Sequence, residues 1–181
     1  MTIRLASDLQ TDSIVDGEGI RTVIWTQGCS HNCFMCHNPQ THAFDGGEEV
    51  EVDDVLERLE TLEGQAGITF SGGDPMFQPK QCAAIARYAH TLGLNVWAYT
   101  GFTFEQLLES KNKDMIDFLN EIDVLIDGKF IVELKSLDAI FRGSTNQRII
   151  DVSKSLKQKK VVLYIEDKKS LKPKKQEGVF I

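Results

Sequence analysis

Three cysteines lie within eight residues of this 181-residue chain: Cys29, Cys33 and Cys36 form the pattern C-x3-C-x2-C. Clustered thiolates hold zinc or an iron–sulfur cluster, and a closed zinc site or an ordinary cluster usually takes a fourth protein ligand. This stretch of the sequence contains only three cysteines. A cubane of four irons held by three cysteines keeps one iron open for a small molecule. The spacing therefore favours a 4Fe–4S cluster that binds a ligand.

Two other uses of these cysteines have to be weighed. A zinc site could recruit His31, His37 or Cys82, but zinc sites usually pair C-x2-C with a second, distant pair, and the sequence has none. Disulfides are disfavoured because the first residues include Asp8 and no apolar stretch, so we expect no signal peptide and a cytoplasmic location. Cys82 follows Pro79 in a helix-like stretch and is predicted to be a core thiol.

Two glycine-containing stretches could hold the ligand of such a cluster. In the segment Ser-Gly-Gly-Asp-Pro, Gly72 and Gly73 lack a Cβ and let a ligand approach the backbone, while Asp74 offers a carboxylate to an ammonium group. In the segment Asp-Gly-Lys-Phe, Asp127 can accept from hydroxyl groups and Lys129 offers three donors to a carboxylate. Each segment taken alone could equally be an ordinary turn.

These motifs follow short apolar, β-branched runs that predict buried strands. We expect strands over residues 22–26, 67–70, 95–99, 123–126 and 161–165. Helices are expected between them, one capped by Asp53, one running from Pro79 to a stop at Gly93, and one opened by a capping box of Thr103 and Gln106.

Alternating strands and helices predict a parallel sheet with right-handed crossovers. Such sheets bind ligands at the carboxyl ends of their strands, which is where Cys29, Gly72, Thr100 and Asp127 fall. The units are too few for a closed eight-unit barrel. We therefore expect an α/β fold with a partial, open β/α barrel and a mostly parallel sheet.

The composition of the chain limits the kinds of partner that it can bind. The net charge of −7 gives no reason to expect nucleic-acid binding, and no apolar run approaches the length of a membrane span. Residues 1–153 hold 11 basic and 24 acidic residues, whereas residues 154–181 hold 9 and 3. We expect a core over residues 1–153 and a lysine-rich C-terminal segment over residues 154–181, which either touches an acidic partner or is simply solvated.

The motifs together resemble those of the radical S-adenosylmethionine (radical SAM) enzymes, and among these the small glycyl-radical activases that serve anaerobic ribonucleoside-triphosphate reductase. The resemblance covers about residues 10–153, and the segments that carry it occur in the family's order: Asp16–Thr22, Gln27–Cys29, His37–Pro39, Ser71–Pro75, Trp97–Gly101, Asp127–Phe130 and Arg142–Gln147. The last segment, R-G-S-T-N-Q, discriminates best because other radical SAM enzymes do not usually carry it.

The resemblance implies two cofactors and two protein partners. A 4Fe–4S cluster on Cys29, Cys33 and Cys36 would bind S-adenosylmethionine (SAM) at its open iron, and an electron from a donor such as reduced flavodoxin would split the sulfonium. The 5'-deoxyadenosyl radical would then take a hydrogen atom from a glycine of the reductase. No acid–base pair is needed, so no catalytic side chain is expected.

The resemblance also implies the residues that border the nucleotide: Met35, Cys36, His37, Gly72, Gly73, Asp74, Asp127 and Lys129. Met35 stands where relatives often place an aromatic residue beside the adenine. Arg21 and Arg142 either hold groups of the partner or form structural ion pairs, and Trp97 and Tyr99 pack in the core or beside the adenine.

Two rival interpretations remain at this point. One is another radical SAM enzyme, either the activase of pyruvate formate-lyase or a small-molecule enzyme such as 7-carboxy-7-deazaguanine synthase. The short chain and the R-G-S-T-N-Q segment argue against both. The other is a zinc-binding or electron-carrier module without catalysis, which would keep four protein ligands and would not respond to SAM.

Overall fold

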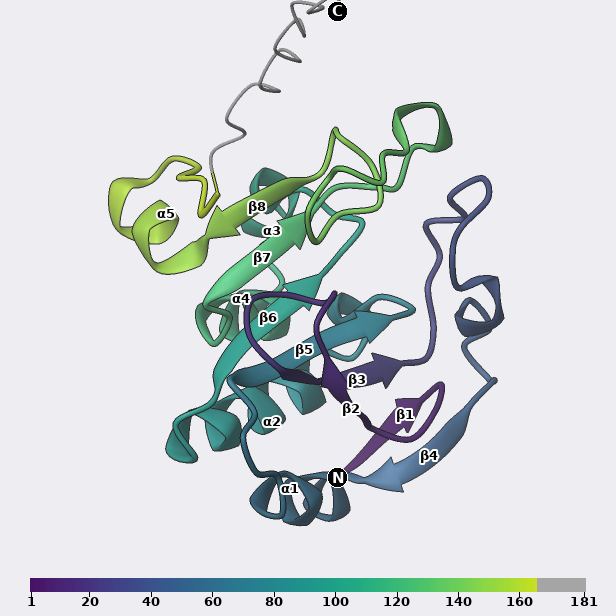
Figure 1. Cartoon of the computed structure of the whole chain (residues 1–181), viewed down its shortest axis with the longest axis vertical. Helices are drawn as coiled ribbons and strands as arrows, with labels where there is room; N and C mark the ends of the chain where they lie inside the picture. Colours follow the sequence, from purple (N-terminus) through teal and green to yellow (C-terminus); the bar gives the residue numbers. More distant parts are fainter. Residues whose placement is uncertain (166–181) are drawn as a thin grey trace, which may run out of the picture.

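The apolar runs of the sequence form the middle of one mixed sheet. In the computed structural model, which describes residues 1–165, β3 (Arg21–Thr26), β5 (Gly67–Gly72), β6 (Asn95–Tyr99) and β7 (Val124–Asp127) pair in parallel in this order (Figure 1). Most of their side chains are buried on both faces, as expected for strands that are covered on two sides.

Antiparallel strands extend this parallel core at both edges. β1 (Thr2–Leu5) and β4 (Glu48–Glu51) continue the sheet beyond β3, and β8 (Arg148–Asp151) pairs with β7. The sheet order is β4-β1-β3-β5-β6-β7-β8, and β2 (Gln10–Ser13) pairs with β3 off this path. The two end strands do not pair with each other, so the sheet is open, as the sequence predicted.

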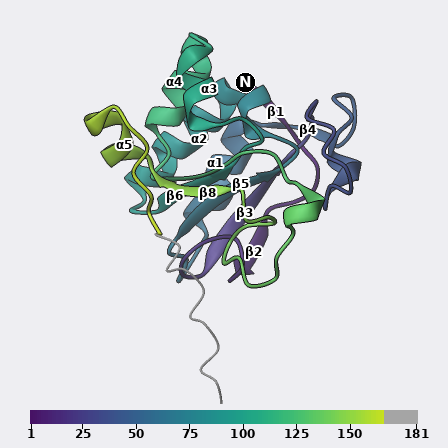
Figure 2. The same cartoon turned by 90° about the horizontal axis from the view of Figure 1, so that it is seen from above.

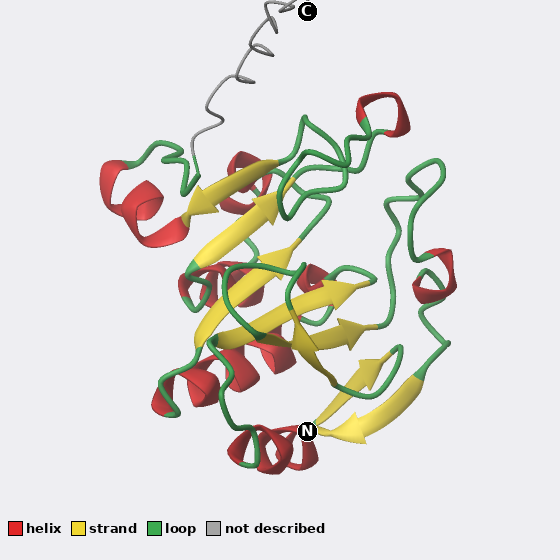
Figure 3. Ribbon diagram, in the orientation of Figure 1, coloured by secondary structure: helices red, strands yellow, loops and turns green. Residues whose placement is uncertain are grey.

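Helices cover one face of the sheet and leave the other face to loops (Figures 2 and 3). They are α1 (Val52–Glu60), α2 (Pro79–Thr91), α3 (Phe104–Glu109), α4 (Lys113–Asn120) and α5 (Val152–Gln158), with short 3-10 turns at Pro39–Thr41, Pro75–Phe77 and Val132–Leu134. The main core lies between helices and sheet, where the rings of Phe70 and Phe118 meet edge to face with centroids 5.2 Å apart. Within residues 1–165, no helix is long and apolar enough to cross a membrane.

Most of the predicted elements are confirmed. Four of the predicted strands match β3, β5, β6 and β7, and the helices expected from Pro79 and from the capping box of Thr103 and Gln106 are α2 and α3. Cys82 is fully buried, as predicted. β1, β2, β4, β8, α4 and α5 were missed. The four strands are only four residues long, and β2 and β4 also lack an alternating apolar pattern.

The predicted cap of α1 and the predicted last strand were wrong. The residue that precedes α1 is Glu51, and Asp53 lies inside the helix, so the acid contributes its charge to the first turn without capping it. Residues 161–165 form no strand, only a single bridge between Leu163 and Ile150. The expected boundary between residues 153 and 154 falls inside α5, and the lysines at 172–175 lie outside the described residues.

Candidate functional site

The three clustered cysteines lie in the loop that follows β3. Backbone hydrogen bonds fold this loop back on itself: Gly28 N–H donates to Thr41 O at 2.8 Å and Cys29 N–H to His42 O at 3.1 Å. All three thiols are free and half-buried. They line one cavity of about 810 Å³ at the carboxyl ends of the parallel strands, within the size range of ligand pockets.

Burial makes the thiols of Cys29 and Cys33 poor acids in the absence of a metal. It raises the pKa of Cys29 to about 11 and also raises the pKa of Cys33. Backbone N–H groups act in the opposite direction and lower these pKa values. The N–H of His31 donates to Cys29, and the N–H of Phe130 donates to Cys33. The Cys36 sulfur accepts from Asn38 N–H at 3.4 Å. The site therefore directs backbone donors at its sulfurs and needs a bound cation to hold the thiolates.

The turn after β5 packs directly on the start of the cysteine loop. Gly73 N–H donates to Thr26 O at 2.7 Å, and Asp74 N–H donates to Gly28 O at 2.9 Å. A Cβ on Gly73 would stand 2.4 Å from Gly28 O, and one on Gly72 would stand 2.5 Å from Thr26 O. The missing side chains of Gly72 and Gly73 thus let the turn pack against the backbone of the chain itself. Both glycines also line the cavity.

Asp74 is buried and its carboxylate accepts four hydrogen bonds. Oδ1 accepts from Met76 N–H at 2.9 Å. Oδ2 accepts from the Thr100 hydroxyl at 2.9 Å, from Gly101 N–H at 2.9 Å and from His31 Nε2 at 2.7 Å. Asp74 does not reach the cavity lining, whereas Gly73 before it does.

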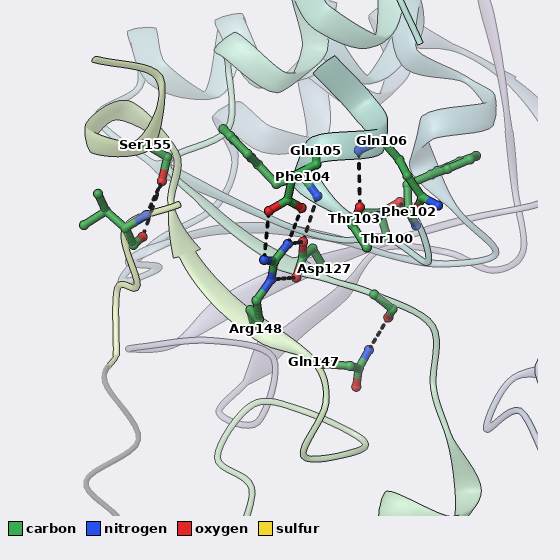
Figure 4. Close-up of polar contacts among 12 residues, drawn as sticks. Thr100, Phe102, Thr103, Phe104, Glu105, Gln106, Asp127, Gln147, Arg148 and Ser155 are labelled. Carbon is green, nitrogen blue, oxygen red and sulfur yellow. Dashed lines mark hydrogen bonds and ion pairs between the residues drawn. The ribbon is translucent and has the colours of Figure 1, made fainter. Parts of the chain in front are cut away.

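Asp127, at the end of β7, is also buried and committed to other contacts (Figure 4). Its carboxylate forms an ion pair with Arg148, which donates from Nε at 3.0 Å and from Nη2 at 2.5 Å, and it accepts from the Phe104 N–H at the start of α3 at 2.7 Å. Arg148 also donates to both oxygens of Glu105. This pairing raises the pKa of Arg148 and lowers that of Glu105 to about 2.

The R-G-S-T-N-Q segment fastens the loop that follows β7. The Gln147 side chain donates to Gly128 O at 3.0 Å (Figure 4). Its oxygen accepts from Gly143 N–H at 2.9 Å and from Ser144 N–H at 3.1 Å. Asn146 Nδ2 donates to Lys129 O at 2.9 Å. These hydrogen bonds tie the two ends of the loop after β7 to each other, and residues between them line the cavity.

The comparisons with known proteins agree with this site. Residues 15–150 match the family described as a 4Fe-4S single cluster domain. Over 142 residues the chain is 34% identical to the anaerobic ribonucleoside-triphosphate reductase-activating protein of Salmonella typhi, an alignment that covers 74% of this chain and 90% of that one. Proteins of the same name from Escherichia coli K12 and phage T4 are 32% and 30% identical, covering 74% and 75% of this chain and 90% and 86% of theirs.

The chain belongs to the family of anaerobic ribonucleoside-triphosphate reductase-activating proteins. The 4Fe-4S match spans all three clustered cysteines and the glycine turn, so the iron–sulfur class of the site is shared with the family. Among solved structures, QueE from Escherichia coli aligns with a TM-score of 0.47 at 13% identity, over 57% of this chain and 54% of that one.

In this member of the activating-protein family, the site residues fit a three-cysteine cluster. Within residues 1–165, no three His, Cys, Asp or Glu side chains converge closely enough to hold a single metal ion. A cubane does not need such convergence because each cysteine binds a different iron. Three free thiols around one cavity, each beside a backbone donor, are a suitable donor set for it.

The structure brings together six of the residues that the sequence placed at the cofactors. Cys29, Cys33, Cys36, His37, Gly72 and Gly73 all line the cavity. Met35, Asp74, Asp127 and Lys129 do not. Met35 is largely exposed, and the Lys129 ammonium lies 3.5 Å from His31 O.

The structure decides between the roles that the sequence left open for Arg21, Trp97 and Tyr99. Arg21 is fully buried, donates to Thr69 Oγ1 at 2.7 Å and lies over the ring of Trp97, so it is structural and cannot reach a partner. Trp97 is a core residue, whereas Tyr99 lines the cavity and donates to Phe141 O at 2.8 Å. The cavity lining also includes Ile14 and Val15, which no sequence motif marks, because only the fold brings β2 beside β3.

Proposed function

We propose that this protein is a radical SAM activase that generates a glycyl radical on anaerobic ribonucleoside-triphosphate reductase. One observation carries the proposal: three free cysteines and the Gly72–Gly73 turn line one cavity at the carboxyl ends of the parallel strands. The names of the relatives supply the protein substrate. This open sheet, with loops on its cavity side, serves as the partial β/α barrel of the radical SAM type.

Cys29, Cys33 and Cys36 would hold the 4Fe–4S cluster, and Gly72, Gly73 and His37 would border SAM in the same cavity. When bound, cluster and SAM supply the chemistry: one electron cleaves the sulfonium to methionine and a 5'-deoxyadenosyl radical, which takes a hydrogen atom from a glycine and leaves as 5'-deoxyadenosine. A donor of the reduced flavodoxin type would deliver that electron. The chain itself binds, orients and shields these groups from water.

The reductase glycine has to reach this cavity, and exposed apolar side chains line it. Ile14 and Val15, from the loop after β2, and Leu137 and Ile140, from the loop after β7, are between 60% and 95% exposed and line the cavity. We name these four residues the apolar rim. Large exposed apolar side chains gathered around one opening are typical of protein-binding sites, so we assign the rim to the reductase segment that carries the glycine.

A mixing experiment tests the function. The protein is reconstituted with iron and sulfide under argon, reduced, and mixed with SAM and the anaerobic reductase. Electron paramagnetic resonance should show a glycyl radical on the reductase, with 5'-deoxyadenosine formed, and the radical should vanish when the reductase glycine is changed to Ala. Turnover of a small metabolite in the absence of the reductase would overturn the proposal.

A further inference from the structure

The Asp74 carboxylate joins the loops that follow three adjacent parallel strands. Its own turn follows β5, His31 belongs to the cysteine loop after β3, and Thr100 and Gly101 follow β6. The three contacts to Oδ2 measure 2.7 Å from His31 Nε2 and 2.9 Å from each of the other two donors. The carboxylate therefore sits where movement of any of these loops would break a buried hydrogen bond.

Asp74 already accepts from four protein donors, three of them at Oδ2. An ionised carboxylate offers about four lone-pair sites, and the fourth donor, Met76 N–H, binds Oδ1 at 2.9 Å. The side chain is 1% exposed and does not line the cavity. An ammonium group in the cavity therefore cannot reach this carboxylate unless the packing around it opens.

His31 is held as firmly as Asp74. The imidazole is 8% exposed, and it packs edge-on against Phe102 with ring centroids 4.6 Å apart. Gly101 leaves room for the ring, since a Cβ there would stand 2.4 Å from His31 Cδ2. The backbone of His31 faces the cluster site, with its N–H directed at Cys29 and its carbonyl near the Lys129 ammonium.

We propose that Asp74 and His31 act as one positioning pair: Asp74 fixes the cysteine loop through His31 against the Gly72–Gly73 turn, and does not itself bind the ligand's ammonium group. This inference rests on the proposed function, since it concerns how the same cavity is set to receive SAM. The ligand's ammonium is left to groups that line the cavity, such as those of the glycine turn.

A double-mutant cycle on SAM affinity tests the pair. His31→Leu removes the donor and keeps an apolar side chain, and Asp74→Asn removes the charge at the same size. Each variant is reconstituted, its iron and sulfide are counted, and SAM is titrated calorimetrically under argon with the cluster oxidised. Loss of a charge-assisted buried hydrogen bond should weaken SAM binding about 10- to 100-fold in either variant. His31→Gln, which keeps an N–H donor, should recover most of the affinity.

The double variant decides between positioning and direct contact. If Asp74 acts through His31, the loss of SAM affinity in the double variant should be well below the product of the two single losses, because both changes remove the same His31–Asp74 hydrogen bond. Multiplied effects would overturn the proposal and assign a direct ammonium contact to Asp74. Wild-type affinity in His31→Leu would overturn it as well. His90→Leu, on the surface of α2, is the matched control and should bind SAM normally.

A second variant covers the case in which His31→Leu loses the cluster. Gly101→Ala leaves both His31 and Asp74 in place but pushes the imidazole aside. Gly101→Ala should weaken SAM binding when His31 is present. In a protein that already carries His31→Ala it should not change SAM affinity, because the added methyl group then has room. Equal losses in both backgrounds would overturn the proposal. If wild-type protein does not bind SAM at all, the proposed function fails instead, so the two failures are distinguishable.

Discussion

At the scale of single residues, the four cysteines differ in where the fold places them. Cys29, Cys33 and Cys36 line the cavity, whereas Cys82 is fully buried on the core side of α2. We expect Ala at any of the first three positions to abolish a stoichiometric 4Fe–4S cluster. Cys82→Ala should keep the cluster and lower the free energy of unfolding by about 1 kcal/mol, since it leaves a small cavity. Iron and sulfide analysis, with denaturant unfolding, measures both. Cluster loss in Cys82→Ala with retention in Cys36→Ala would contradict the ligand assignment.

A second residue-scale prediction concerns Gly73. Because its missing Cβ leaves room for Gly28 O, Gly73→Ala should displace the cysteine loop as well as the turn, and should lower cluster content together with SAM affinity. Visible absorbance of the reconstituted protein reports the cluster. The control is Gly64→Asn, at a turn where an added Cβ would have nothing within 4 Å and where the left-handed φ is one that Asn tolerates. Full cluster content in Gly73→Ala would show that the turn can shift independently of the cysteine loop.

At the scale of elements, the loop after β7 depends on the Gln147 amide. Gln147→Glu places an oxygen opposite Gly128 O in a nearly buried site, so a donor is lost and two acceptors face each other. We expect the free energy of unfolding to fall by about 1–3 kcal/mol, measured by urea denaturation. Asn120→Asp, which replaces an exposed amide that donates to Ile116 O at the end of α4, is the matched control and should change stability much less.

The ion pair between Glu105 of α3 and Arg148 of β8 should make the free energy of unfolding depend on pH. Arg148 lowers the pKa of Glu105 from 4.5 to about 2, so the pair stabilises the folded state above pH 4.5 and loses that contribution as the pH falls from 4.5 to 2. Wild type should therefore be more stable than Glu105→Gln at pH 7, and the difference should shrink through this window. Urea midpoints at several pH values measure it. A difference that stayed constant down to pH 2 would contradict the pairing.

At the scale of the whole molecule, the helices cover one face of the sheet (Figure 2). The apolar rim lines the cavity at the carboxyl ends of the parallel strands. Leu137→Asp should therefore weaken activation of the reductase at least ~10-fold while SAM affinity stays normal, because the charge would be buried on docking. Radical yield against reductase concentration, with a SAM titration, separates the two effects. Leu108→Asp, at an exposed leucine of α3 away from the cavity, is the control and should activate normally. Equal losses in both variants would contradict the rim assignment.

The local sequence determined the cluster chemistry and the central strands. The spacing of Cys29, Cys33 and Cys36 depends only on neighbours in the chain, and so do the apolar runs of β3, β5, β6 and β7 and the capping box of α3. Such signals involve contacts within a few residues, so they can be recognised without the fold.

Tertiary structure alone decided what the polar residues of those motifs contact. Asp74 and Asp127 look like free carboxylates in the sequence, yet the fold buries both and pairs them with His31 and Arg148, which lie 43 and 21 residues away. The same holds for Gln147, whose partner Gly128 is 19 residues away. A buried polar group must find donors wherever the packed strands bring them, and no pattern of neighbouring residues encodes that meeting.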